Sequence, residues 1–442
     1  MTQSAAALIA ATRFGFAARG DDLGTIASNP HQWVVGQLRS APAPLPGELP
    51  SSASVVTQIL ERRRDKGDDA ARKEFGQTMR QIYLAEVEAR LAAAADSDTP
   101  LLERLTQFWS NHFTVSALRP IVTGLCGAFE REAIRPHVTG RFSDMLLAAE
   151  SHPAMLLYLD NAVSIGPESM AGERTGRGLN ENLGREILEL HTLGVDGGYT
   201  QDDVEALARI LTGWSLARLV EPDPGTFMFR ERAHEPGAKT LLGRRYAEDG
   251  RNEGVAALRD LAAHPATAHH IATKLARHFI ADKPPADAVA RIAATFQQSG
   301  GDLARVTEAV AHEDAVWREP LAKVRTPNEL VIASCRVAQW TPKPPLIAGS
   351  LRVLDQLPYH APQPSGWPDD AASWISPEAV LRRAQWCEAF ADRMPDPPDA
   401  AALVGATLGD GASAESVDAI RAAPSRRTAV ALLLASPEFQ RR

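Results

Sequence analysis

The chain has 442 residues, a length that predicts two or three domains or lobes and allows a large buried core. Its formal net charge of -8 and its pI near 5.9 argue against a broad nucleic-acid or anionic-membrane surface, since such surfaces need clustered excess lysine and arginine. The three cysteines, Cys126, Cys335 and Cys387, lie far apart in the chain and predict no disulfide framework.

The N-terminus has only a short apolar run, with no basic region before it and no cleavage pattern, so it does not predict a secretory signal. No segment approaches the roughly 18 apolar residues that a membrane span requires. The sequence therefore predicts a soluble, cytoplasmic protein without a membrane span and without a nucleic-acid partner.

Low aromatic content and many alanines predict a mainly α fold, in which a large multi-helix body carries a small inserted β-hairpin. We expect four segments along the chain. These are an N-terminal helix with a proline-rich arm (1–50), a first helical lobe (51–225), the hairpin (226–246), and a second helical lobe with a Pro/Trp loop (247–442).

In the first lobe, helical periodicity runs over residues 54–115, and shorter helices fit residues 124–134, 143–150 and 153–160. A Gly-rich polar loop follows at 164–179. Leu183, Ile187 and Leu190 form the apolar stripe of the next helix, which should end at Gly194. Thr200 and Asp203 then predict a capping box at the start of another helix.

Phe227 and Phe229 alternate with polar residues before HEPGA and the apolar run KTLLG, a pattern that predicts a β-hairpin. Beyond it, helices are expected over 265–280, 286–298, 303–312 and 328–340. Thr326 and Glu329 predict a second capping box. The stretch LPYHAPQPSGWPDDAASWISP, residues 357–377, predicts a rigid irregular loop.

Five blocks of the sequence resemble the bacterial family called "domain of unknown function 1800". They are FWSNHF at 108–113, NENLGREILELHTLGVDGGYTQDDV at 180–204, LTGW at 211–214, HEPGAKTLLG at 234–243 and PSGWPDD at 364–370. The resemblance implies a mainly helical bacterial protein with relatives that are often exported. It also implies gene neighbours of a second family that resembles sulfatases. This chain departs from the family in showing no export signal.

The 180–204 block crowds ionisable residues into about three helical turns. Arg185 stands four residues from both Glu181 and Glu189, which fits a solvated ladder of weak ion pairs. If the helix is central, as its place in the family signature suggests, Arg185 would instead hold two carboxylates as a binding residue. Glu186, Glu189 and His191 are then the candidate catalytic residues.

Three histidines in separate family blocks, His112, His191 and His234, are candidate ligands for a divalent or redox metal. Taken alone, His112 and His191 fit a structural role better, whereas His234 occupies a turn beside Glu235 where chemistry is easier to place. The spacing of the three matches no established metal motif. A further run, His264, His269, His270 and His278, is interpreted as solvated, although His270 shares a helix face with Lys274 and Arg277.

The Pro/Trp loop offers two interpretations. Trp367 and Trp374 could fill the join between the two lobes, or the loop could form one wall of a pocket, with Trp367 and Asp369 binding a ligand.

Two functions follow as hypotheses. The first is an enzyme with a His/Glu polar site between helices, and one version of it uses a metal for hydrolysis or oxidation. The alternative is a non-catalytic helical partner or scaffold for the sulfatase-like protein encoded nearby. The motifs GxGxxG, GxxxxGK[ST] and GxSxG are absent, so dinucleotide, P-loop and common serine-hydrolase functions lose their usual support.

Overall fold

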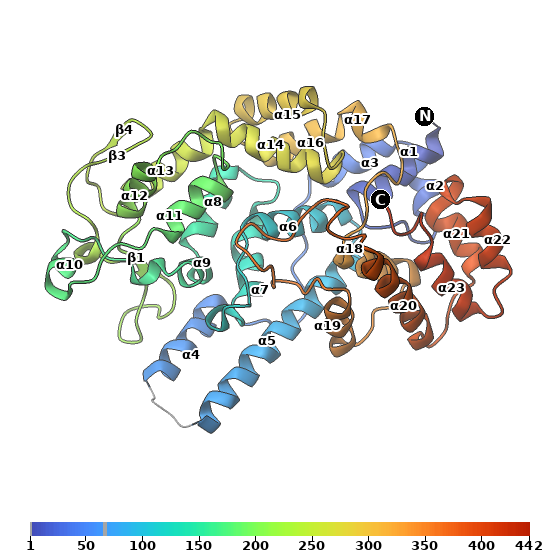
Figure 1. Cartoon of the computed structure of the whole chain (residues 1–442), viewed down its shortest axis with the longest axis horizontal. Helices are drawn as coiled ribbons and strands as arrows, with labels where there is room; N and C mark the ends of the chain where they lie inside the picture. Colours follow the sequence, from blue (N-terminus) through green and yellow to red (C-terminus); the bar gives the residue numbers. More distant parts are fainter. Residues whose placement is uncertain (1, 65–68) are drawn as a thin grey trace.

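Helices dominate the computed structural model, which describes residues 2–64 and 69–442, so the predicted mainly α class is confirmed (Figure 1). The N-terminal third contains α1 (Gln3–Ile9), α2 (Asp22–Ala27), α3 (Pro30–Gln37), α4 (Ser52–Arg64), α5 (Asp69–Asp96) and α6 (Pro100–His112). The next group comprises α7 (Cys126–Phe129), α8 (Phe142–Ser151), α9 (Pro153–Tyr158), α10 (Met170–Thr175), α11 (Asn182–Glu186) and α12 (Gln201–Ile210).

The second half of the chain is helical again after the strands. It contains α13 (Arg251–Ala263), α14 (Pro265–Phe279), α15 (Ala286–Ser299), α16 (Leu303–Ala311), α17 (Asp314–Trp317) and α18 (Pro327–Ala338). The C-terminal helices are α19 (Pro344–Val353), α20 (Pro377–Arg393), α21 (Ala400–Leu408), α22 (Ala414–Arg421) and α23 (Arg426–Ala435). None of the helices described is both long enough and apolar enough to cross a lipid bilayer.

Local sequence signals account for several helix boundaries. Both predicted capping boxes are present, at Thr200 with Asp203 and at Thr326 with Glu329. The single helical run expected over 54–115 is three helices instead. Pro100 at the first turn of α6 accounts for one break, because proline lacks the N–H that would continue a preceding helix. The predicted run also crosses residues 65–68, which lie outside the described residues.

The strands form two small antiparallel sheets near one end of the molecule. β1 (Trp214–Leu216) pairs with β2 (Phe227–Phe229), and β3 (Lys239–Leu241) pairs with β4 (Arg244–Tyr246). The predicted strand at Phe227–Phe229 therefore exists, but it pairs back with β1 and not with the KTLLG segment. Leu242 and Gly243 both have positive φ and form the tight two-residue turn of the β3–β4 hairpin.

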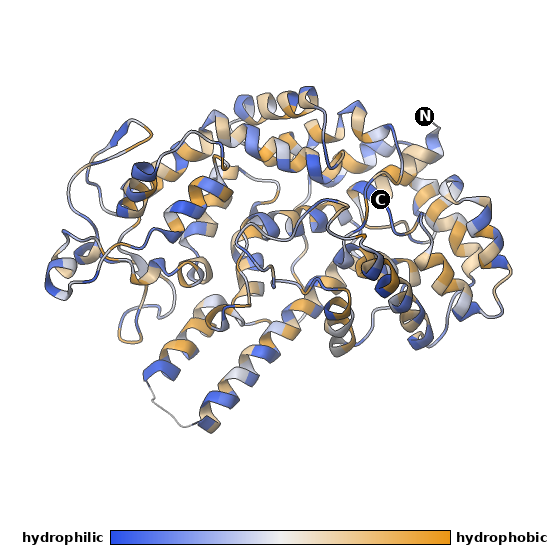
Figure 2. Ribbon diagram, viewed as in Figure 1, coloured by the Kyte–Doolittle hydropathy of each residue, from blue (hydrophilic) through white to orange (hydrophobic). Residues whose placement is uncertain are grey.

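α6 lies at the centre of the helical body (Figure 1). Ten of its thirteen residues are buried, whereas hydrophobic and hydrophilic residues alternate around the outer helices (Figure 2). The N-terminal segment contributes to the same core, because Phe14 stacks on Phe279 and Trp317. Arg13 is also buried, and its guanidinium donates to the carbonyl oxygens of Phe279 and Ile280 at the end of α14. The central helix thus has packed chain on most sides.

Candidate functional site

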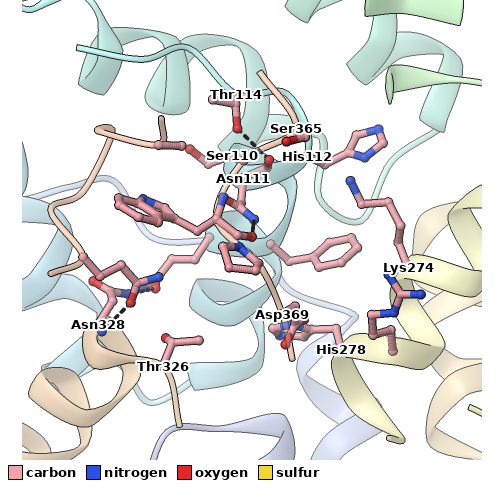
Figure 3. A pocket seen from close by; sticks show the side chains of 18 of the residues that line it. Ser110, Asn111, His112, Thr114, Lys274, His278, Thr326, Asn328, Ser365 and Asp369 are labelled. Carbon is pink, nitrogen blue, oxygen red and sulfur yellow. Dashed lines mark hydrogen bonds and ion pairs between the residues drawn. The ribbon is translucent and has the colours of Figure 1, made fainter. Parts of the chain in front are cut away.

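A cavity of about 920 Å³ lies between α6, α14, the start of α18 and the loop at 356–372 (Figure 3). α6 contributes Arg104, Gln107, Phe108, Ser110, Asn111 and His112 to its lining, and α14 contributes His270, Lys274, Arg277 and His278. The loop supplies a further wall that includes Tyr359, Ser365, Trp367 and Asp369. Polar side chains from segments that are far apart in the sequence therefore face one shared cavity.

Asn111 of the FWSNHF block fixes the loop to α6. Its side-chain amide donates to the carbonyl oxygen of Trp367 at 2.9 Å and accepts from the Trp367 N–H at 2.8 Å. The neighbouring Gly366 has φ +84°, and a Cβ there would lie 2.4 Å from the Asn111 carbonyl oxygen. Only glycine allows this close approach. The FWSNHF and PSGWPDD blocks, which are far apart in the sequence, therefore contact each other directly in the fold.

The signature block reaches the same cavity through its backbone. Residues Ile187–His191 form a π-helical turn at the end of α11. The carbonyl oxygen of His191 lies 3.1 Å from Nε2 of His112, and that of Leu190 lies 3.1 Å from Nε2 of His270. A carbonyl oxygen can only accept a hydrogen bond, so both imidazoles carry a proton on Nε2. This turn therefore sets the tautomers of two cavity histidines.

Burial keeps both of these imidazoles neutral. It lowers the pKa of His112 well below its usual value, and it lowers the pKa of His270 to about 4, with Lys274 reinforcing both shifts. In a neutral ring with its proton on Nε2, Nδ1 is a hydrogen-bond acceptor. The buried Nδ1 of His112 has no hydrogen-bond partner among the described residues. It is therefore available to accept a proton or hydrogen bond from a ligand.

Behind His112, the side chain of His191 faces away from the cavity towards α8. Its Nδ1 lies 2.8 Å from Oε1 of Glu150, and both side chains are at most 1% exposed. Gly194, which ends the block, has φ +86°, and a Cβ there would lie 2.8 Å from Nδ1 of His270. The missing side chain at Gly194 thus makes room for the His270 ring.

Lys274 is the principal cation inside the cavity. Its amine points towards the His112 ring (Figure 3) and has neither an ion pair nor a hydrogen bond with any residue that the structure describes. Burial lowers its pKa to about 8, and Arg277 lowers it further while Asp369 opposes the shift. Such a cation lacks a protein counter-ion and offers its charge to a ligand.

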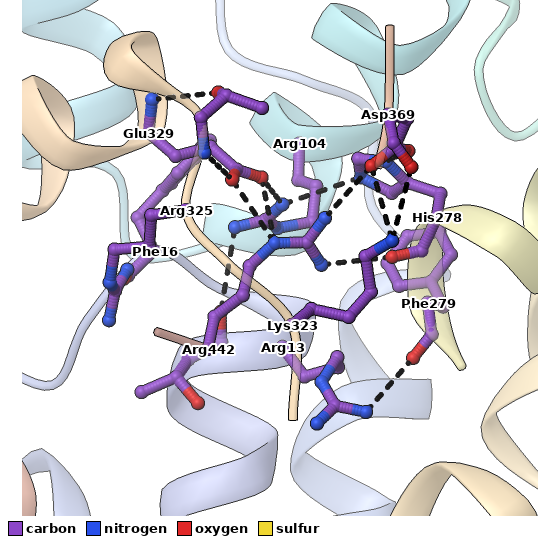
Figure 4. A network of polar contacts seen from close by, with 12 residues as sticks. Arg13, Phe16, Arg104, His278, Phe279, Lys323, Arg325, Glu329, Asp369 and Arg442 are labelled. Carbon is purple, nitrogen blue, oxygen red and sulfur yellow. Dashed lines mark hydrogen bonds and ion pairs between the residues drawn. The ribbon is translucent and has the colours of Figure 1, made fainter. Parts of the chain in front are cut away.

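In contrast, the carboxylates at the base of the cavity are paired with cations of the protein (Figure 4). Arg104 and Arg442 both pair with Glu329, and Lys323 pairs with Asp282 at 2.6 Å. Burial would raise the pKa of Glu329, but Arg442 and Arg104 hold it well below its usual value. These ion pairs join segments that are far apart in the sequence, so the network serves to hold the helices around the cavity.

Asp369 joins the network to the loop. Its carboxylate accepts a hydrogen bond from Nδ1 of His278 and lies 3.4 Å from Nζ of Lys323. Burial lowers the pKa of His278 to about 4. The neutral ring then accepts at Nε2 from Arg104, which lies 3.3 Å away. Asp369 therefore lines the cavity with its carboxylate already engaged by His278 and Lys323.

The residues predicted as catalytic lie beside the cavity and do not line it. Glu186 and Glu189 are half-buried on the signature helix, where burial raises the pKa of Glu186. Arg185 pairs with Glu181 at 2.9 Å and makes no ion pair with Glu189, so it does not hold two carboxylates. Its side chain is 41% exposed.

The structure places only two of the three candidate metal ligands together. The rings of His112 and His191 lie 6.1 Å apart, whereas His234 lies under the β3–β4 hairpin, with Nε2 3.0 Å from Glu253 and Nδ1 2.9 Å from the carbonyl oxygen of Thr212. Among residues 2–64 and 69–442, no group of three or more His, Cys, Asp or Glu side chains could hold a metal ion. Both ring nitrogens of His234 are already engaged.

Three residues that line the cavity are not identified as site residues from the sequence. The interpretation of His270 and His278 as solvated is wrong, because His270 packs against Leu190 and Gly194 of the signature block and His278 bonds to Asp369 of the loop. His269 is exposed, as expected. Lys274 was noted only as a neighbour of His270. The available signal was the spacing of residues 270, 274 and 278, which repeats every four residues and places all three on one helix face.

Removing the Asn111 side chain should release the loop. We expect Asn111→Ala to lower the free energy of unfolding by about 1 to 3 kcal/mol, because the Trp367 backbone loses both partners. Denaturant unfolding measures the loss, and hydrogen exchange of residues 358–372 should accelerate. Asn182→Ala, at an exposed position, is the matched control. Unchanged exchange in the loop would contradict the role given to Asn111.

Together, the fold and the cavity define a mainly helical protein with a polar, cation-bearing cavity at its centre. The chain belongs to the family described as "Protein of unknown function (DUF1800)", whose family model matches residues 9–441. No curated protein and no solved structure matches the chain.

Proposed function

We propose that the central cavity is the ligand site of this protein and that it binds a small organic anion anchored by Lys274. The observation that carries the proposal is the position of this lysine, whose amine faces the cavity without a counter-ion among the described residues. Arg277 and Lys283 are exposed and also line the cavity, so they add positive charge where a ligand would enter.

The lining also offers unpaired polar atoms of the kinds that hydroxyl and carbonyl groups need. Nε2 of Gln107, the Tyr359 hydroxyl and Nε1 of Trp367 are buried, and none has a partner among the described residues. Buried polar groups are seldom left unpaired in proteins. Water would complete the hydrogen bonds of these atoms when no ligand is bound, and a polar ligand that displaces the water would replace them.

His112 gives the cavity a proton acceptor next to its anion anchor. A neutral imidazole near a cation can remove a proton from a bound organic acid or its nucleophile, which favours an enzyme over a simple binding protein. The presence of a concave polar cavity likewise supports a ligand-directed function over a scaffold for a sulfatase-like partner. The metal-assisted version of the enzyme hypothesis is tested by elemental analysis of untagged protein, with His191→Ala as comparison.

The direct test measures binding of small carboxylates, phosphate and sulfate by thermal shift and calorimetry. A charge-assisted hydrogen bond contributes about 1.5 to 3 kcal/mol, so Lys274→Met should weaken binding by roughly 10- to 100-fold. Lys73→Met removes an exposed lysine from α5 and should leave binding unchanged. If no anion binds, or if both variants bind as wild type does, the cavity is not the site proposed.

A further inference from the structure

We propose that Lys274 forms a covalent imine with its ligand, so that the cavity takes a small organic acid that also carries a ketone or aldehyde group, such as a 2-oxo acid. This inference rests on the proposed function and deepens it by naming the substrate class. It follows from the surroundings of the lysine, which differ from those of the other lysines that the structure describes.

Lys239 and Lys323 are buried, but each has a carboxylate partner, Glu253 at 3.1 Å and Asp282 at 2.6 Å. Lys73, Lys283 and Lys343 are exposed to solvent. Among the described lysines, only Lys274 combines a partly buried amine, an adjoining cavity and the lack of an ion pair. The ammonium form of Lys274 is therefore stabilised less, by carboxylates or by solvent, than the ammonium forms of the other described lysines.

An amine must lose its proton before it can attack a carbonyl carbon. With a pKa of about 8, roughly a quarter of the Lys274 side chains carry the free amine near pH 7.5, against about one in a thousand for an ordinary lysine. The charged groups that act on this amine are Asp369 and Arg277, and the neutral imidazoles of His112 and His270 lie in the same cavity wall. The other charged or titratable groups of the lining are Arg90, Arg104, His278, Asp282, Lys283, Glu329, Tyr359 and Asp370. Desolvation beside a second cation is an established route to a nucleophilic lysine.

His112 can handle the protons that imine formation moves. The free amine of Lys274 bonds to the carbonyl carbon, and Nδ1 of His112 takes one proton from the resulting ammonium nitrogen and passes it to the oxygen, which gives a carbinolamine. A proton from solvent then joins the carbinolamine hydroxyl, which leaves as water. The C=O bond is replaced by a C=N bond with a single hydrogen on nitrogen. No oxidant or reductant is required.

The test uses the full-length protein with three probes of similar size. Pyruvate carries both a carboxylate and a carbonyl, lactate lacks the carbonyl, and acetone lacks the carboxylate. Each is incubated with protein and cyanoborohydride, which reduces an imine to a stable amine, and adducts are located by peptide mass spectrometry. The pyruvate adduct at Lys274 should exceed that at exposed lysines at least about ten-fold, because its amine is the least protonated.

Lys274→Met should abolish this preferred adduct without altering the background at Lys73 and Lys343. Acetone should label Lys274 less than pyruvate does, since it lacks the anionic group. The imine proposal is overturned if pyruvate adducts are spread evenly over the exposed lysines, or if no adduct forms at Lys274. Lactate separates the two proposals: if it raises the melting temperature of wild type but not of Lys274→Met while pyruvate gives no adduct, the anion site stands and the covalent step fails.

Discussion

Glu329→Gln should lower the free energy of unfolding by about 3 to 5 kcal/mol, the usual cost of breaking a buried ion pair from one side. Glu329 is 5% exposed and pairs with both Arg104 and Arg442. The amide has nearly the same shape but no charge, so two buried guanidinium groups lose their principal anion. Arg442 retains only Asp369, at 3.6 Å.

The effect should depend on pH in a defined direction. The folded pKa of Glu329 is depressed, so its stabilisation is complete above the unfolded pKa of about 4.3 and is lost as pH falls towards the folded value. The difference between wild type and Glu329→Gln should therefore be constant near neutral pH and shrink below pH 4. Urea unfolding at several pH values measures it.

Asp287→Asn provides the control for this experiment. Asp287 pairs with Arg291 at 2.9 Å, but its side chain is 70% exposed. A solvated pair of this kind contributes little, so its loss should change stability by less than about 1 kcal/mol. Equal losses in the two variants would mean that the network beneath the cavity does not hold the helices together.

The sequence predicts helices well here because their signals are local. Thr326 and Glu329 are three residues apart, and their capping box needs no distant partner. The strand pairing was harder. Phe227–Phe229 shows the correct alternation, yet nothing within the segment indicates whether it pairs with the residues before it or after it. The choice of β1 as partner is a tertiary event.

The candidate site was predictable in part for the same reason. Helical periodicity places His112 and His191 on inward faces, and the structure brings them together although they are 79 positions apart in sequence. Periodicity cannot show that Asn111 holds Trp367, a contact across 256 positions. It also cannot show that a loop covers one face of α14. Lys274 and His270 therefore resemble solvated residues in the sequence, because neither the loop nor the turn at Leu190 that packs on His270 is adjacent to them in the chain.

The signature block illustrates a second limit. Its side chains suggested catalysis by Glu186, Glu189 and His191, whereas its contacts with the cavity are made by two backbone carbonyl groups. A π-helical turn leaves carbonyl oxygens outside the regular i→i−4 pattern, and these can then orient other residues. Sequence reasoning that considers only ionisable side chains overlooks such a role.

Lys274→Met should make the protein more stable at neutral pH, the opposite of most core substitutions. The lysine titrates near pH 8 when folded and near 10.4 when unfolded, so burying its charge costs free energy below pH 8. Methionine has a similar length and no charge. We expect a gain of about 1 to 3 kcal/mol at pH 7, allowing for partial exposure of the side chain.

The sign of the pH dependence makes this prediction specific. As pH rises from 8 to about 10.4, the folded lysine has lost its proton while the unfolded chain still binds one, so wild-type stability increases relative to the variant. The gain from Lys274→Met should therefore fade across that window, whereas Lys73→Met should show no such trend. Denaturant unfolding at pH 7 and pH 10 tests both.

A group that costs stability yet occupies the cavity is characteristic of a residue retained for binding or catalysis. A loss of stability in Lys274→Met at pH 7 would instead indicate that the lysine holds the fold, and the cavity would then lack its anchor.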